Sequence, residues 1–325
     1  MRKGKYFATA AIVCASVVLL YVANASSLEP PPVDGPGLLA HRGLHQTFST
    51  VGLKNDTCTA SRIDPPRHGY LENTIPAIKA AFSLGASVVE IDVHPTTDKK
   101  FVVFHDWTLD CRTDGHGVTR NHSLAELKKL DIGYGYTADG GRTFPFRGKG
   151  VGLMPLLDEV LDAFPQRSFL INVKSNDAEE GVLLADALAK RPPEELARIM
   201  VYGGDRPIAS LKKQMPHLRV MSRASIKSCL LTYVALGWSG YVPTSCRDSI
   251  LLIPSNIGPW LWGWPNRFDA RMAKVNTVTF ASGAYTGGQF STGIDSMDDF
   301  RRLPKGYAGG ISTDRIEVLA QILKR

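Results

Sequence analysis

Residues 88–106 read VVEIDVHPTTDKKFVVFHD, two short apolar runs that flank a polar turn. The first run carries Glu90 and Asp92, and the second ends in His105 and Asp106. Because residues i and i+2 of a strand point to the same face, Glu90 and Asp92 are expected side by side. Two carboxylates among Val and Ile repel unless a cation or a shared proton lies between them. The stretch therefore indicates a metal site at a strand end, with a histidine from the next strand; a surface carboxylate pair is the alternative.

Short apolar runs alternate with amphipathic segments along most of the remaining chain, and residues 238–274 are its least regular part. This alternation is typical of an α/β fold, and at this length it predicts a single (β/α)8 TIM barrel with polar strand ends lining the active face. The eight expected strands lie at residues 38–40, 88–93, 101–106, 169–174, 199–202, 219–223, 277–281 and 310–314.

The N-terminus resembles an export signal. A basic start, MRKGK, precedes the apolar run Tyr6–Ala23, and Ala23-Asn24-Ala25 fits a small-x-small cleavage pattern. The run is also just long enough for an uncleaved membrane anchor, so both interpretations are open. We therefore divide the chain into a signal peptide or anchor (1–25), a Pro/Gly-rich linker (26–37) and one domain (38–325), which we expect to be exported to the periplasm or secreted.

The cysteine count agrees with export. Apart from Cys14, in the apolar run, the chain has four cysteines. An even number in an exported protein favours two disulfides. Sequence alone does not fix their connectivity; we prefer Cys58–Cys111 and Cys229–Cys246, with four buried thiols as the alternative.

The charge is modestly positive. The formal net charge is +7, and three of these charges precede the apolar run, which leaves 7 − 3 = +4 for the rest. No basic stripe with interleaved aromatic residues is present, so the sequence does not indicate nucleic-acid binding. The small excess mildly favours anionic substrates.

Polar residues collect where the predicted strands end. In a barrel they would meet at one mouth. Oxygen ligands favour Mg²⁺ or Ca²⁺, and Arg and Lys beside such an ion form a pocket for a phosphate. Two histidines can serve as general acid and general base. The combination suits in-line displacement at a phosphodiester. The residues concerned are His41, Arg42, Glu90, Asp92, His105, Asn172 and Lys174.

The motifs HRG, ENT, EIDV, VVFHD, a strand ending in Lys and a terminal GGISTD together resemble the glycerophosphodiester phosphodiesterase family. The resemblance spans about residues 38–325 and is strongest over 38–174. It implies a TIM barrel that uses one divalent metal to hydrolyse glycerophosphodiesters to an alcohol and glycerol 3-phosphate.

The resemblance also implies residue roles. His41 and His105 match the acid/base pair, Arg42 and Lys174 the phosphate-binding residues, and Glu90 and Asp92 two metal ligands. The ENT glutamate is Glu72, which we expect to support the site or start a helix. The family usually has an acid at the third ligand position, where this chain has Asn172. An amide oxygen carries no charge, so we expect weaker metal binding or preference for a different cation.

Two segments have roles that the sequence leaves open. The loop at 44–71 would be held over the mouth by a Cys58–Cys111 bridge and would help select the alcohol group. The stretch Trp260–Trp264 either packs between barrel and helix or contacts lipid, so membrane association through it or the N-terminal segment is one expectation. Two alternative functions are a phospholipase D-like enzyme acting on lysophospholipids or sphingomyelin, and a non-catalytic phosphate-binding module.

Overall fold

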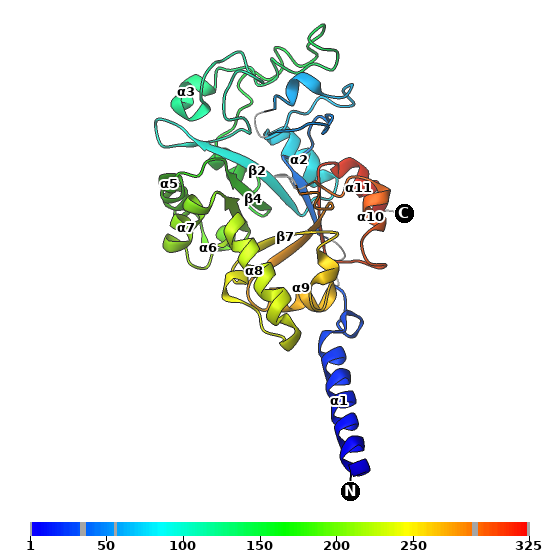
Figure 1. Ribbon diagram of the computed structural model, residues 1–325. Helices are drawn as coiled ribbons and strands as arrows, with labels where there is room; N and C mark the ends of the chain where they lie inside the picture. Colours follow the sequence, from blue (N-terminus) through cyan, green and yellow to red (C-terminus); the bar gives the residue numbers. More distant parts are fainter. Residues whose placement is uncertain (1, 33–36, 55–56, 288–291, 324–325) are drawn as a thin grey trace.

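Eight parallel strands form a nearly closed barrel within the part of the chain that the computed structural model describes, residues 2–32, 37–54, 57–287 and 292–323 (Figure 1). The strand order is β6-β5-β4-β2-β1-β9-β8-β7. The barrel closes where the Val220 amide donates to the Asp248 carbonyl at 3.1 Å and the Ser249 hydroxyl donates to the Val220 carbonyl at 2.8 Å. The strands are β1 (Leu38–His41), β2 (Val88–Pro95), β4 (Ser168–Val173), β5 (Ile199–Gly203), β6 (Arg219–Ser222), β7 (Ile250–Pro254), β8 (Val278–Ser282) and β9 (Gly310–Thr313).

The helices that pack on the outside of the barrel follow most strands, as the alternating pattern predicts. Thr74 begins α2 with an N-cap, its hydroxyl accepting the Ala77 amide. Ile78, Ala81 and Phe82 of α2 are buried against the barrel. The helices are α1 (Arg2–Asn24), α2 (Ile75–Ser83), α3 (Leu124–Leu127), α4 (Leu157–Ala163), α5 (Ala178–Leu188), α6 (Pro193–Leu196), α7 (Asp205–Gln214), α8 (Arg223–Leu236), α9 (Asn266–Ala273), α10 (Met297–Arg301) and α11 (Ile316–Leu323).

The barrel contains one strand that was not predicted from the sequence, and one predicted barrel strand lies outside it. The missed strand is β7, inside the segment that we took as irregular, although ILLIP is a short apolar run typical of a buried parallel strand. The excluded strand is β3 (Phe101–Val103), which pairs antiparallel with the end of β2. The polar turn between β2 and β3 is too short for the crossover that a parallel pair requires, so these strands form a hairpin.

A lobe of loops covers one end of the barrel. Its described parts are residues 44–54, 57–71 and 102–156, and it has its own apolar core. A disulfide between Cys58 and Cys111 joins its two parts, with 5.5 Å between the Cα atoms, as predicted. The second predicted disulfide, Cys229–Cys246, joins α8 to the segment before β7. The lobe core consists of Ala60, Ile63, Leu71, Val102, Phe104, Leu109, Leu127, Ile132, Tyr136, Phe146 and Met154.

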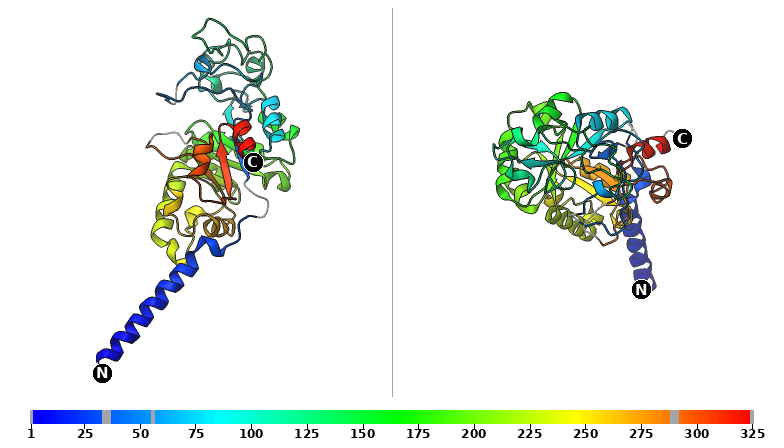
Figure 2. Two further views of the ribbon diagram at one scale, coloured as in Figure 1. Left: turned by 90° about the vertical axis from the view of Figure 1, so that its right-hand side faces the viewer. Right: turned by 90° about the horizontal axis from the view of Figure 1, so that it is seen from above.

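Helix α1 projects from the barrel at the end opposite the lobe (Figures 1 and 2). Its last residue is tied to the barrel, because the Asn24 amide donates to the Trp238 carbonyl at 2.9 Å and Arg271 donates to the Asn24 side chain at 3.1 Å. In the described residues, no helix combines the length and the apolar character needed to cross a bilayer. Part of the predicted linker, residues 33–36, lies outside the described residues.

The aromatic stretch Trp260–Trp264 lies between α8 and α9. Trp264 stacks on Tyr307 with 5.8 Å between ring centroids, as expected for packing between helix and barrel. The Trp262 indole nitrogen donates to the carbonyl of Val234 in α8. Trp260, in contrast, is 75% exposed. The stretch therefore contributes to packing through Trp264, while Trp260 faces solvent.

Candidate active site

Neighbouring strand ends bring the predicted site residues together. In the register of the sheet, His41 of β1 pairs with Glu90 of β2, and Asp92 of β2 pairs with Asn172 of β4. Because carboxyl ends of parallel strands lie on the same face of a barrel, these side chains surround one mouth. The structure thus brings the candidate residues from β1, β2 and β4 together.

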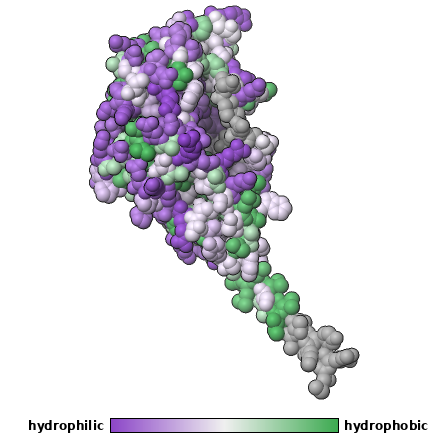
Figure 3. Space-filling view, turned by 60° about the vertical axis from the view of Figure 1, so that its left-hand side comes forward, coloured by the Kyte–Doolittle hydropathy of each residue, from purple (hydrophilic) through white to green (hydrophobic). Residues whose placement is uncertain are grey.

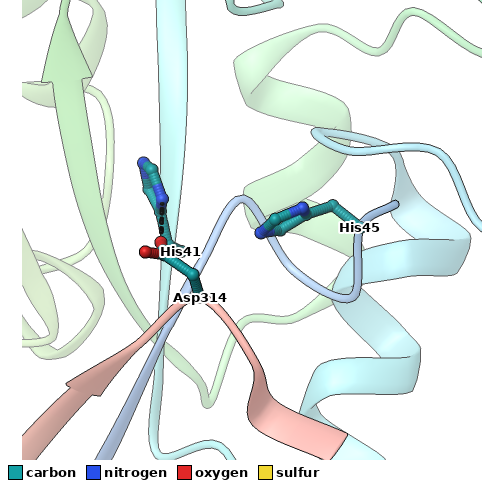
Figure 4. Close-up of side chains that lie close together, drawn as sticks. All are labelled: His41, His45 and Asp314. Carbon is teal, nitrogen blue, oxygen red and sulfur yellow. Dashed lines mark hydrogen bonds and ion pairs between the residues drawn. The ribbon is translucent and has the colours of Figure 1, made fainter. Parts of the chain in front are cut away.

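His41 is held by a carboxylate from the last strand of the barrel. Its Nδ1 lies 2.5 Å from Oδ1 of Asp314, the residue that follows β9 (Figure 4). Its Nε2 lies 3.7 Å from Oε2 of Glu90. Burial and the Arg42 guanidinium would lower the pKa of His41, but the Glu90 and Asp314 carboxylates outweigh them and raise it. The Asp314 contact fixes the ring, and Nε2 accepts a hydrogen bond from Arg42 Nε at 3.2 Å. Proton transfer at Nε2 would replace this Arg42 contact.

Arg42 reaches into the acidic cluster from an unusual backbone conformation. Its φ of +56° turns the chain so that its own amide donates to Glu90 Oε2 at 3.2 Å. The guanidinium lies 3.1 Å from Glu72 Oε1, and its Nε lies 3.4 Å from Asp92 Oδ2. Glu72 therefore supports the site, as the sequence analysis expected. Burial would raise the pKa of Glu72, but Arg112 and Arg42 outweigh it and lower the pKa to about 2.

Glu90 and Asp92 are both buried, with at most 1% of either residue exposed. Burial and the nearby Asp92 raise the pKa of Glu90 to about 7. Burial would also raise the pKa of Asp92, but the Lys174, His105 and Arg42 side chains hold it well below its ordinary value. Lys174 Nζ lies 3.3 Å from Asp92 Oδ1. Two neighbouring carboxylates are costly to bury without positive charge beside them. The acid pair Glu90 and Asp92 is therefore suited to binding a cation.

Two polar residues that the sequence analysis did not assign to the site orient this acid pair. The Tyr202 hydroxyl, on β5, donates to Glu90 Oε1 at 2.7 Å. Asn73, which has a φ of +58°, makes two hydrogen bonds with Asp92. Its Nδ2 donates to the Asp92 carboxylate at 3.0 Å, and the Asp92 backbone amide donates to Asn73 Oδ1 at 3.1 Å. Asn172 also donates from Nδ2 to Asp92 Oδ1, at 2.8 Å. The acid pair is therefore held in one orientation from three sides.

His105 reaches the mouth differently from the prediction. It follows β3, the antiparallel strand outside the barrel, and the Phe104 amide donates to the Asp92 carbonyl at 2.9 Å to hold this segment on β2. Its Nδ1 lies 2.6 Å from Asp106 Oδ1, which repeats the histidine–carboxylate arrangement of His41. Burial and the Arg42 and Lys174 cations lower the pKa of His105 to about 4. This ring is therefore neutral at pH 7, with Nε2 free of the Asp106 contact.

A fully buried arginine connects the lobe to the site. Arg112 contacts Asp106 Oδ2 and Glu72 Oε2, each at 2.8 Å, and is 2% exposed. It also donates to the Tyr136 hydroxyl and the Thr59 hydroxyl, each at 2.5 Å. Arg112 thereby holds both Asp106, the partner of His105, and Glu72, the partner of Arg42.

The residues missed from sequence carried different amounts of signal. Asp314 ends the GGISTD motif, and its position as the last residue of the predicted strand 310–314 was a usable indication. Arg112 lies in a loop without periodicity, next to Cys111, and nothing local distinguishes it from a surface arginine. Tyr202 lies in a predicted strand among apolar residues, where a tyrosine is ordinary.

Three comparisons place the chain among known proteins. Residues 41–191 match the sequence profile of the glycerophosphoryl diester phosphodiesterase family. A glycerophosphodiester phosphodiesterase of Caldanaerobacter subterraneus subsp. tengcongensis is 27% identical over 264 residues, which cover 78% of this chain and 93% of that protein. A human lysophospholipase D is 34% identical over 116 residues, 33% of each chain.

The fold agrees with these matches. A phosphodiesterase of Oleispira antarctica, solved with the product sn-glycerol 3-phosphate, superimposes with a TM-score of 0.54 at 19% identity over 89% of this chain and 97% of that one. The profile match begins at His41 and contains the two histidines and the acid pair described above. The chain therefore belongs to the glycerophosphoryl diester phosphodiesterase family and is a phosphoric diester hydrolase.

Proposed function

We propose that this protein is a metal-dependent phosphodiesterase that hydrolyses water-soluble glycerophosphodiesters to an alcohol and glycerol 3-phosphate. One observation carries the proposal: two histidines, each held by a carboxylate at Nδ1, accompany a buried acid pair and two cationic side chains. Proton donor, proton acceptor and phosphate-binding charges are then present together. The non-catalytic module considered from sequence does not fit a member of a hydrolase family with these groups intact.

The acid pair fits a divalent metal. Glu90 and Asp92 offer carboxylate oxygens, the ligands that Mg²⁺ and Ca²⁺ prefer. Burial and the repulsion of Asp92 raise the pKa of Glu90, and a cation between the two carboxylates would oppose both effects. Glu90, Asp92 and Asn172 would hold the ion, the first two through carboxylate oxygens and Asn172 through its amide oxygen. Such an ion supplies Lewis-acid stabilisation of charge on the phosphate oxygens.

The side chains of this protein would divide the remaining work. The two histidines would transfer protons at Nε2, one to the leaving alcohol oxygen and one from the attacking oxygen, while Asp314 and Asp106 keep the rings in place. Arg42 and Lys174 would neutralise the phosphate charge, because they are the cationic side chains that contact Asp92.

Hydrolysis of glycerophosphocholine is the direct test. We expect the purified protein to release glycerol 3-phosphate and choline, to lose this activity in EDTA, and to recover it when Mg²⁺ or Ca²⁺ is added back. Product assays with each metal would identify the cation. No turnover under any metal condition, by a folded protein, would contradict the proposal.

A second candidate, a phospholipase D-like activity on lysophospholipids, is favoured by the match to a human lysophospholipase D. The same assay with lysophosphatidylcholine separates the two candidates. Faster turnover of lysophosphatidylcholine than of glycerophosphocholine would favour the second one, and analysis of the product would show whether a cyclic phosphate forms. The lobe loop at 44–71, fixed by the disulfide at Cys58, is our candidate for selecting the alcohol group.

Replacing Asn172 with aspartate should strengthen metal binding. The change restores a negative charge at the third ligand position and removes the amide that donates to Asp92. We expect the metal concentration for half-maximal activity to fall by about tenfold, the range associated with changes around a metal centre. A metal titration of both proteins measures it. An unchanged titration would show that Asn172 is not a ligand.

We further propose that the protein is exported and works near a membrane surface. Two disulfides support an oxidising compartment. Apolar side chains cover the described part of α1, among them Ile12, Val17 and Leu19, each more than half exposed (Figure 3). The exposed Trp260 is a second candidate contact. N-terminal sequencing of the mature protein would distinguish cleavage of the first 25 residues from their retention as an anchor.

A further inference from the structure

A second histidine beside His41 has a nitrogen without a hydrogen-bond partner. His45, in the loop after β1, is 6% exposed, and its Nδ1 donates to the Gln46 carbonyl at 2.8 Å. Nδ1 therefore carries the proton, and Nε2 keeps its lone pair. Among the described residues, this buried Nε2 has no hydrogen-bond partner. A buried acceptor is usually satisfied, so an unpaired one indicates a ligand.

The unpaired nitrogen points at the His41–Asp314 pair. Figure 4 shows the far edge of the His45 ring turned toward those two side chains. One ligand atom from each of His41, His45 and Asp314 lies within 4.8 Å of the others. An ion centred among them would lie within about 2.8 Å of each atom, so shifts of less than about 1 Å would give the Zn–N distance of about 2.0–2.1 Å.

We propose that His41, His45 and Asp314 form a second cation site, for a borderline transition-metal ion such as Zn²⁺, whose occupation inhibits the enzyme. Two imidazoles and one carboxylate are typical zinc ligands, whereas the carboxylate pair Glu90 and Asp92 suits a hard cation. Water would complete the tetrahedral coordination. The inhibitory effect rests on the proposed function, but metal binding does not.

Inhibition follows from the atom that the ion would bind, which is Nδ1 of His41. In the structure, His41 Nδ1 contacts Asp314 Oδ1. An ion on Nδ1 would replace this hydrogen bond and withdraw electrons from the ring, so Nε2 would become a weaker proton acceptor. His45 contributes a ligand only, because its Nδ1 is committed to the backbone. The site would therefore act on catalysis through His41.

The test uses Co²⁺ as a spectroscopic substitute, with the full chain held in excess Mg²⁺ to fill the oxygen site. We expect the wild type to develop the visible absorption of four-coordinate cobalt, and Zn²⁺ to displace it. His45→Gln should lower the affinity for Zn²⁺ in calorimetry by at least about tenfold, since losing a ligand should cost at least as much as losing an outer partner. His116→Gln, at a histidine whose side chain is 87% exposed, is the matched control and should bind like wild type.

Activity provides the second readout. Zn²⁺ should inhibit the wild type and His116→Gln, whereas His45→Gln should keep its activity without Zn²⁺ and resist inhibition by at least about tenfold. His45→Met, which retains bulk, guards against a folding defect, and circular dichroism checks each variant. Equal zinc affinity in folded wild type and His45→Gln would overturn the site. If His45→Gln lost zinc binding but the wild type hydrolysed no diester, only the proposed function would be refuted.

Discussion

Replacing His41 with alanine is expected to reduce kcat for glycerophosphocholine by about 10²- to 10⁴-fold, the usual contribution of a general acid or base. The variant loses the Nε2 that lies 3.7 Å from Glu90 Oε2, and it leaves the Asp314 carboxylate without its imidazole partner. KM should change little, because the variant retains Arg42 and Lys174, which we propose bind the phosphate. Steady-state kinetics in saturating metal would measure both parameters.

Two variants make this test specific. Asp314→Asn keeps the imidazole but weakens its orientation, so we expect a smaller loss in kcat than for His41→Ala. His116→Gln changes an exposed histidine and should leave kcat unchanged. A folded His41→Ala protein with at least half of the wild-type kcat would remove His41 from the mechanism.

Replacing Arg112 with methionine is expected to destabilise the protein by about 3–5 kcal/mol, the typical cost of removing one partner of a buried ion pair. The guanidinium is the shared partner of Glu72 and Asp106, both of which are buried or nearly so. Methionine fills much of the volume but leaves these carboxylates without their main counter-charge. Urea denaturation, under conditions that keep the disulfides intact, would measure the loss.

The same substitution should also lower activity in the folded population. Glu72 orients Arg42, and Asp106 orients His105, so both depend on Arg112. Arg112→Lys keeps the charge but cannot reproduce the four donor contacts, and we expect an intermediate loss of stability. Arg301→Met removes an exposed arginine paired with Asp298 and should change little. A loss below about 1 kcal/mol in Arg112→Met would show that this cluster is not a major source of stability.

The family assignment and the acid pair could be read from local sequence. The i, i+2 spacing of Glu90 and Asp92 places both carboxylates on one strand face wherever that strand lies. His41 and Lys174 likewise end apolar runs that form barrel strands. The predicted disulfides were also confirmed. These features depend on strand periodicity and motif order, which the sequence contains.

Two errors in the predicted barrel have a common cause. Strand β7 was missed and β3 was counted because a short apolar run does not reveal its partner. Isolated from its neighbours, ILLIP looks no more like a barrel strand than FVV. The length of the connection was the stronger signal, since the turn before β3 leaves no room for a crossover.

The sequence by itself determined the barrel class, the acid pair and the two histidines, because each depends on a short-range pattern. Only the tertiary structure decided which groups hold them. His41 meets Asp314 across 273 positions of chain, and Arg112 meets Glu72 from within a loop. No local periodicity encodes such contacts, because barrel closure and lobe packing create them. The same closure brings His45 beside Asp314, which is why a second cation site was visible only in three dimensions.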